Sequence, residues 1–273
     1  MVNYIYYAIK NNGAFKTNTS LKINNFDKFK IINDSFKLRK IVKNNELGLI
    51  NELKEMATSL KKNNSTLHIT GLSSHGGVHS HIDHLLGLIK WASDNKLKKE
   101  AIHIITDGRD TPAKSASKYL NQIESCIKKF NVGEIASICG RYWIMDRNLL
   151  WDRTEKAFSN LTDPDIQITN ISPQDYIEKS YAKKITDEFI EPIRISENYL
   201  KDGDSLICFN FRPDRARQIV KSLSVNEFSD FERKNYPNLD FVTFTQYDPN
   251  FPVKVAFPPE SLGSRYDGGT LPF

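Results

Sequence analysis

This sequence of 273 residues has little cysteine, no long apolar run and no strong excess of one charge. Its three cysteines, Cys126, Cys139 and Cys208, lie far apart without CxxC spacing. We therefore expect buried free thiols in a reducing compartment, with the cytoplasm as the default. No apolar run approaches the roughly 18 residues of a membrane span, and the N-terminus lacks the charged and apolar regions of a signal peptide. These absences predict a cytoplasmic protein without a membrane partner.

The distribution of charged residues also argues against nucleic acid as a partner. The net charge is only +5, and the lysines are scattered along the chain while several arginines stand in short motifs. Scattered lysines are typical of a solvated face, and no basic stripe interleaved with aromatic residues is present. Localised arginine fits a small anionic ligand better, because the planar guanidinium holds a carboxylate or phosphate with two hydrogen bonds.

Short β-type runs alternate with helical patterns from Thr66 onward. The patterns predict strands at 67–71, 101–106, 134–139, 205–210 and 241–245. They predict helices at 46–60, 81–93, 113–130 (opened by Pro112), 150–161 and 214–223. This alternation predicts an α/β fold with a doubly wound, mainly parallel sheet flanked by helices in three layers. Residues 1–28 and the tail 263–273 carry no such pattern, and we expect residues 1–28 to be poorly ordered.

The unusual residues follow the predicted strands. Four loops carry them: SSHGGVHSH at 73–81, DGRD at 107–110, GRYWIMDR at 140–147 and FRPDR at 211–215. Because ligands bind outside the carboxyl ends of the strands in doubly wound sheets, we expect five arginines to converge there: Arg109, Arg141, Arg147, Arg212 and Arg215. One arginine after a strand is more often a surface or capping residue, but its recurrence from loop to loop favours a ligand. About three negative charges, one phosphate plus one carboxylate, would suit five guanidiniums.

Two further features of these loops have both a functional and an ordinary interpretation. Gly76 and Gly77 can expose backbone N–H groups and open a helix at the anion, although glycine pairs are also common in ordinary turns. Asp110 beside Arg109 can act as a general base on a hydroxyl, or it can simply be salt-bridged. The sequence leaves both alternatives open.

The histidines raise a rival hypothesis. All six lie between His68 and His103, and the segment from His79 to His84 matches the HxHxDH pattern of two-metal hydrolases of the metallo-β-lactamase type. Those enzymes need further histidine ligands downstream, yet no histidine follows His103. Their antiparallel sandwich also disagrees with the alternation of strands and helices. We therefore assign no metal ligands here, and expect His81 and His84 at a helix start, one of them buried and hydrogen-bonded.

Five longer segments resemble cofactor-independent (2,3-bisphosphoglycerate-independent) phosphoglycerate mutase. In chain order they are LHITGLSSHGGVHSHIDHLLGLIKWA, HIITDGRDTPAKSASKYL, IASICGRYWIMDRNLLWDRTEKAF, DSLICFNFRPDRARQI and FTQYDPNFPVKVAFPPESL, within 66–262. The resemblance implies that residues 29–262 are the substrate-binding (phosphotransferase) domain of a cytoplasmic isomerase of glycolysis and glucose catabolism. That enzyme interconverts 3-phosphoglycerate and 2-phosphoglycerate.

The resemblance also implies roles for individual residues. The substrate contacts would be His79, Arg109, Asp110, Arg141, Arg147, Arg212 and Arg215, with Asp110 acting catalytically at the substrate hydroxyl. In the family, a separate alkaline-phosphatase-like domain holds two manganese ions and the serine that takes the phosphoryl group. No segment here resembles that domain or its metal ligands. We therefore expect a partial chain, monomeric and inactive without this partner domain.

One position departs from the family pattern. The family has aspartate where this chain has His75, and an imidazole changes the local charge there. Together with the unmatched ends, this departure keeps a second hypothesis open, in which the chain is a non-catalytic binding module or a remnant.

Overall fold

A single sheet forms the centre of this computed structural model, which describes residues 35–259 and residue 261. The seven strands lie in the order β4-β3-β2-β1-β5-β6-β7. All neighbouring strands are parallel except β3 and β4. Their bounds are β1 Leu67–Leu72, β2 Glu100–Thr106, β3 Glu134–Gly140, β4 Ile193–Arg194, β5 Ser205–Cys208, β6 Asp240–Thr243 and β7 Lys254–Val255. Because the strand order reverses between β1 and β5, the loops that follow these two strands flank a position where doubly wound sheets bind ligands.

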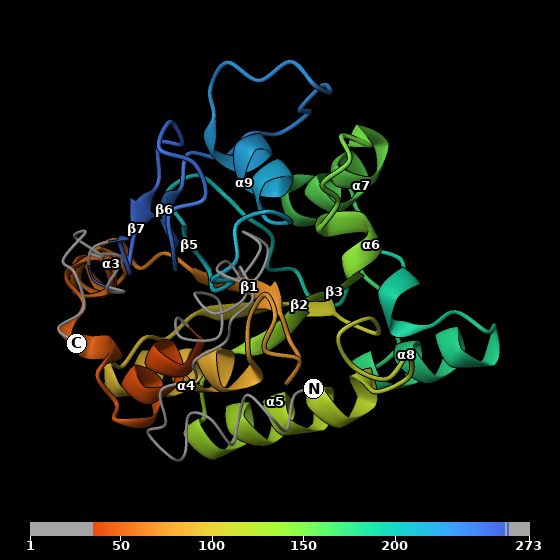
Figure 1. Cartoon of the computed structure of the whole chain (residues 1–273), viewed down its shortest axis with the longest axis horizontal. Helices are drawn as coiled ribbons and strands as arrows, with labels where there is room; N and C mark the ends of the chain where they lie inside the picture. The colour runs from red at the N-terminus through yellow and green to blue at the C-terminus, as the bar shows by residue number, and fades with distance from the viewer. Residues whose placement is uncertain (1–34, 260, 262–273) are drawn as a thin grey trace, which may run out of the picture.

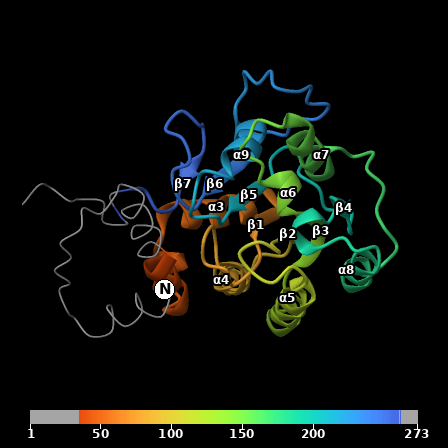
Figure 2. The same ribbon diagram turned by 45° about the vertical axis from the view of Figure 1, so that its right-hand side comes forward.

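Helices cover both faces of the sheet (Figures 1 and 2). One face packs against η1 Leu47–Leu49, α3 Asn51–Asn63, α4 Ile82–Asp94, α5 Ala116–Phe130 and α8 Pro173–Ala182. The other packs against α6 Arg141–Ile144, α7 Trp151–Thr162 and α9 Arg217–Ser224. A short 3-10 helix, η2 Asp187–Phe189, precedes β4, and residues 35–43 are also helical. The predicted three-layer α/β fold is thereby confirmed.

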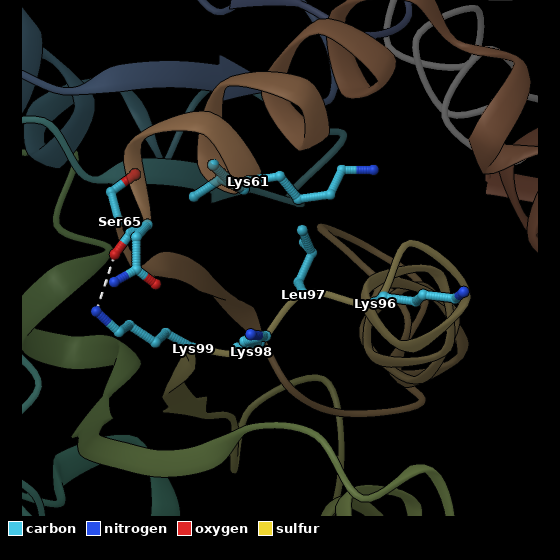
Figure 3. Close-up of a pocket in the computed structure, with 8 residues that line it drawn as sticks. Lys61, Ser65, Lys96, Leu97, Lys98 and Lys99 are labelled. Atoms are coloured by element: carbon cyan, nitrogen blue, oxygen red, sulfur yellow. Dashed lines mark hydrogen bonds between the residues drawn. The ribbon is translucent and has the colours of Figure 1, made fainter.

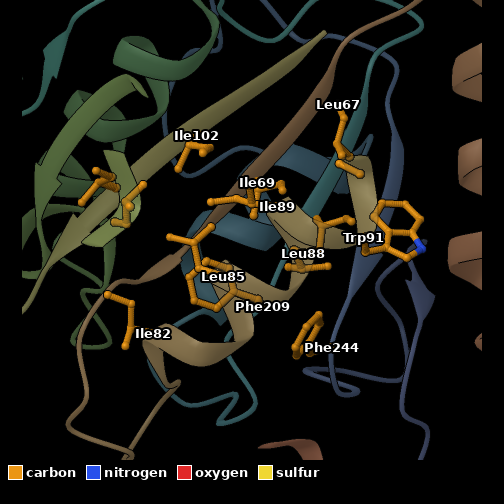
Figure 4. Close-up of a cluster of buried hydrophobic side chains, with 14 of the residues drawn as sticks. Leu67, Ile69, Ile82, Leu85, Leu88, Ile89, Trp91, Ile102, Phe209 and Phe244 are labelled. Carbon is orange, nitrogen blue, oxygen red and sulfur yellow. The ribbon is translucent and has the colours of Figure 1, made fainter. Parts of the chain in front are cut away.

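Alternation along the strands supplies both halves of the core. Ile69 and Ile102 face α4, where Leu85 and Ile89 pack against them in a cluster of fully buried side chains (Figure 4). Residues that point to the opposite side of a strand, such as Ile105 on β2, face α7 and α9 instead. Burial of each large aliphatic side chain contributes about 1.5–3 kcal/mol. The sheet is therefore buried on both faces, and it holds the ends of its strands in fixed positions.

Helix α3 begins at Asn51 rather than Glu46, after the separate 3-10 helix η1. Two further helices begin three residues later than the sequence pattern predicts. Helix α5 begins at Ala116 rather than Ala113, because the Asp187 carboxylate accepts hydrogen bonds from the backbone N–H groups of Ser115 and Ala116. Helix α9 begins at Arg217 rather than Asp214. The Pro213 carbonyl accepts from the N–H groups of Ala216 and Arg217, which keeps the preceding residues in a turn. Both delays leave loop residues at the carboxyl edge of the sheet.

Other expectations concern the cysteines, the chain ends and the membrane. All three thiols are free; Cys139 and Cys208 are buried as predicted, whereas Cys126 is only half-buried. The predictions for residues 1–28 and 263–273, and the boundaries at 28 and 262, lie outside the described residues. No helix in the described part of the chain is long and apolar enough to cross a membrane.

Candidate functional site

The loops after β1, β2, β3 and β5 meet at the carboxyl edge of the sheet. The carbonyl of His79 accepts a 2.8 Å hydrogen bond from the N–H of Phe211, which joins the first loop to the last. Gly76 lies so close to the second loop that a side-chain Cβ there would stand 2.8 Å from Cβ of Asp110. Glycine at position 76 therefore permits this close approach. The convergence expected from the strand pattern is present.

Arg141 is buried at the base of this edge between two carboxylates. Its Nη1 donates at 2.7 Å to Oδ1 of Asp107 and at 2.7 Å to Oδ2 of Asp110. The Arg141 side chain is only 2% exposed, whereas that of Asp110 is 18% exposed. The Asp110 carboxylate therefore remains accessible to a ligand, while the buried guanidinium of Arg141 fixes the orientation of that carboxylate.

Asp214 forms ion pairs with two arginines on the other side of the site. Its Oδ2 accepts from Nη1 of Arg147 at 2.8 Å, and its Oδ1 lies 2.8 Å from Nε of Arg212. Nδ1 of His79 lies 3.6 Å from the same Oδ1, too far for a hydrogen bond. Burial, and then the charge of Arg141, lower the pKa of His79 to about 4 despite the neighbouring carboxylate. His79 is thus neutral at pH 7, and within the described ranges its buried Nδ1 has no hydrogen-bond partner.

Arg215 is the least compensated of the five arginines. Its Nη1 donates to the carbonyl of Met145 at 3.3 Å, and no carboxylate among residues 35–259 forms an ion pair with it. Burial, followed by the charges of Arg147, Arg141 and Arg109, lowers the pKa of Arg215. Four guanidiniums therefore lie close enough to repel one another. Arg109 is more exposed and pairs with Glu188 at 3.3 Å.

The charge balance of the site differs from the one expected from sequence. Five arginines face the carboxylates of Asp107, Asp110, Glu188 and Asp214, which leaves a formal excess of one positive charge. The count of five guanidiniums made from the sequence did not include these internal ion pairs. An anionic ligand that contacts Arg109, Arg147 or Arg212 competes with the ion pairs that Glu188 and Asp214 make in this structure.

Comparison with known proteins identifies the family. Residues 38–249 match the family described as BPG-independent PGAM N-terminus. The chain belongs to this family. It is 71% identical over 228 residues to the 2,3-bisphosphoglycerate-independent phosphoglycerate mutase of Prochlorococcus marinus subsp. pastoris, covering 84% of this chain and 42% of that protein. The mutase of Rippkaea orientalis is 47% identical over 212 residues, 78% of this chain and 40% of that protein.

A solved structure supports the same family. Phosphoglycerate mutase of Leishmania mexicana, crystallised at low cobalt concentration, matches with a TM-score of 0.76 and 26% identity. The match covers 83% of this chain and 44% of that one. This member of the BPG-independent PGAM N-terminus family thus spans less than half the length of the curated relatives it matches.

The histidine pattern of this family member does not build a metal centre. His81 caps α4, its Nδ1 accepting from the N–H of Asp83 at 3.1 Å, while His84 is fully buried against Phe211 and Phe244. Burial lowers the pKa of His84 to about 3. No three His, Cys, Asp or Glu side chains come together as metal ligands within 35–259 and 261. This geometry contradicts the HxHxDH hydrolase hypothesis. Both histidines lie at the helix start and are buried, but only His81 is hydrogen-bonded.

The remaining features of the first loop also become clear. Gly77 adopts a left-handed φ of 71°, but α4 begins only at Ile82. Of the two alternatives for the glycine pair, the one in which it opens the helix is therefore wrong, since His81 provides the cap. His75 is exposed and contacts the hydroxyl of Tyr119 on α5.

A small cavity lies at the opposite edge of the sheet (Figure 3). It measures about 90 Å³ and is lined by residues just before β1 and β2, among them Ser65, Leu97 and Lys99. Lys99 turns to the Asn64 carbonyl, to which its Nζ donates at 2.8 Å. None of the loop residues that carry the family motifs lines this cavity, so we place the candidate site at the arginine-rich edge.

Proposed function

We propose that this chain holds the substrate of a phosphoglycerate mutase and binds 3-phosphoglycerate, 2-phosphoglycerate or glycerate through His79, Arg109, Asp110, Arg141, Arg147, Arg212 and Arg215. The observation that carries the proposal is Arg215, a partly buried cation among three other guanidiniums and without a carboxylate partner in the described chain. An anionic group placed there relieves the repulsion and gains charge-assisted hydrogen bonds. The unpartnered Nδ1 of His79 offers a further polar contact nearby.

Asp110 has the position of a general base in this proposal. Its carboxylate is held at 2.7 Å by Arg141 and is still partly accessible. A substrate hydroxyl within hydrogen-bond distance of Asp110 could pass its proton to the carboxylate. Arg141 would then fix the direction from which the carboxylate approaches, and the other arginines would hold the charged ends of the substrate.

The complete reaction belongs to the longer relatives. Interconversion of the two phosphoglycerates needs a phosphoryl acceptor and, by the family resemblance, manganese. The described residues of this chain group no metal ligands, so they do not fit the metals. We infer that the chain by itself binds substrate without turnover. We further infer that it works in the cytoplasm, as a monomer beside an alkaline-phosphatase-like domain.

A ligand series tests the proposal. Isothermal titration calorimetry should show that the chain binds 3-phosphoglycerate more tightly than glycerate or inorganic phosphate. Only 3-phosphoglycerate offers both anionic groups. A coupled mutase assay with manganese should show no turnover. Equal affinity for all three ligands, or no binding by a folded chain, would contradict the proposed function and favour the remnant hypothesis. Robust turnover would show that the chain contains a nucleophile of its own, which would contradict the inferred lack of activity.

A further inference from the structure

We propose that Asp107, which lies outside the set of expected substrate contacts, is the positioning residue that locks three loops of the site into one arrangement. The predicted effect of Asp107 on ligand binding rests on the proposed function. The positioning of the loops by Asp107 rests only on the geometry of the free protein.

Four donors converge on the Asp107 carboxylate, which is 1% exposed. Oδ1 accepts from Nη1 of Arg141 at 2.7 Å and from the N–H groups of Asp110 at 2.9 Å and Arg109 at 3.1 Å. Oδ2 accepts from Oγ of Ser74 at 2.5 Å. These donors belong to the loops after β1, β2 and β3, so one side chain connects three segments that are distant in sequence.

A buried carboxylate is stable only when its lone pairs are satisfied, and here they are. Burial would raise the pKa of Asp107, but the hydrogen bonds and the charge of Arg141 outweigh it and lower the pKa. Asp107 is therefore charged at neutral pH. No atom of it needs to touch the ligand, because its effect passes through Arg141 and through the backbone that carries Arg109 and Asp110.

The shared guanidinium explains why a charge is required at position 107. Nη1 of Arg141 lies at the same 2.7 Å from Asp107 and from Asp110, so neither carboxylate holds the guanidinium alone. Without the charge of Asp107, Arg141 would pair with Asp110 only. That pairing would draw the Asp110 carboxylate away from a ligand hydroxyl and leave the loop after β2 less fixed.

Asp107→Asn tests this role, with Asp204→Asn as the matched control. Asp204 is also a buried aspartate that accepts two backbone N–H bonds and one side-chain bond, but it stands at the opposite edge of the sheet, before β5. We expect Asp107→Asn to weaken 3-phosphoglycerate binding at least tenfold, in a protein whose amide NMR spectrum shows that it remains folded. Asp204→Asn should leave the affinity within twofold. Equal effects of the two substitutions would overturn the proposal.

A double-mutant cycle separates positioning through Arg141 from a general loss of structure. Because part of the effect of Asp107 passes through Arg141, Asp107→Asn should weaken binding by a smaller factor in an Arg141→Lys background than in the wild type. Additive effects would contradict the role.

A second variant applies where Asp107→Asn does not fold. Ser74→Ala keeps the charge of Asp107 and removes one of its hydrogen bonds. We expect this variant to weaken binding about threefold, as for one lost hydrogen bond. An unchanged affinity would likewise overturn the proposal.

The free protein supplies a readout that needs no ligand. In the wild type, the guanidinium protons of Arg141 should give slowly exchanging NMR signals because two carboxylates hold Nη1. These signals should broaden in Asp107→Asn and persist in Asp204→Asn. If the wild type fails to bind 3-phosphoglycerate but shows this difference, the proposed function is wrong and the positioning role stands. Unchanged Arg141 signals in Asp107→Asn would refute the positioning role itself.

Discussion

Replacing His84 with leucine tests how burial controls the acid stability of this fold. His84 lies on α4 with no exposed surface, and its ring meets Phe211 and Phe244 at centroid distances of 5.8 Å each. Neither ring nitrogen has a hydrogen-bond partner in the described part of the chain. Leucine is close to histidine in volume and suits these apolar neighbours. The substitution therefore removes an unpaired polar ring and leaves a packed core.

The magnitude follows from the pKa of the ring. An unfolded histidine has a pKa of about 6.5, whereas burial lowers that of His84 to about 3. As the pH falls below 6.5, the unfolded chain binds the proton first, so the native state loses stability until the pH reaches the folded pKa. At about 1.4 kcal/mol per pH unit, the loss at pH 5 is about 2 kcal/mol. Above pH 7 the ring is neutral in both states, and this loss vanishes.

Urea denaturation of wild type and His84→Leu at pH 7.5 and pH 5.0 measures the effect. We expect the two proteins to differ by no more than about 1 kcal/mol at pH 7.5, since loss of an unpaired polar group offsets any change in packing. At pH 5.0 the variant should gain about a further 2 kcal/mol over the wild type. The other buried histidines are present in both proteins, so their contributions cancel in the difference. The same stability difference at both pH values would refute the reasoning.

Two further substitutions test the framework around the site. Gly140→Ala should lower the free energy of unfolding by about 2 kcal/mol or more, because a Cβ there would stand 2.5 Å from the carbonyl oxygen of Glu188; a thermal melt indistinguishable from wild type would contradict this packing. Asp204→Asn should cost about 2 kcal/mol at pH 7, as for hydrogen bonds to a charged group, since its carboxylate meets Nε2 of His68 at 3.2 Å. Burial raises the pKa of that carboxylate, but hydrogen bonds from His68 and from the backbone N–H groups of Thr66 and Lys201 outweigh burial and keep the pKa low. Its contribution to stability is therefore present above pH 4 and fades as the pH falls further; urea titrations at pH 7.0 and 3.5 that show an equal cost of the substitution would contradict this account.

The fold could be predicted largely because the sheet is buried on both faces. Strands such as 101–106 and 134–139 read as short continuous apolar runs, which is what a parallel strand with helices on either side requires. The edge strand β4 has only two residues, Ile193–Arg194, and runs antiparallel to β3. Its pairing depends on the position of β3 rather than on any local pattern. The pattern in 163–203 therefore did not predict β4. Helix α8 was also missed, although Ser172 and Pro173 at its start are typical of a helix N-terminus.

The site was predictable in its place but not in its charge balance. The motifs follow the strands, and the topology of the sheet then brings His79, Arg141 and Arg212 to one edge. The partners of the arginines were missed for different reasons. Asp107 and Asp214 lie within the motifs themselves, where an acidic residue beside arginine could have signalled an internal ion pair. Glu188 is 79 residues from its partner Arg109, and only the folded chain brings these two together.

The central claim is that the arginine cluster binds a phosphorylated carboxylate. An NMR titration of the wild type with 3-phosphoglycerate, run beside Arg215→Ala and the distant control Arg233→Ala, tests it most directly. Arg233 donates to the backbone carbonyls of Ser222 and Val225 at the C-terminal end of α9, and it belongs to none of the motif loops. We predict saturable shifts in the loops that carry Arg109, Arg147 and Arg212, retained in Arg233→Ala and at least tenfold weaker in Arg215→Ala. Shifts that are absent from a folded wild type, or equally strong in Arg215→Ala, would contradict the account.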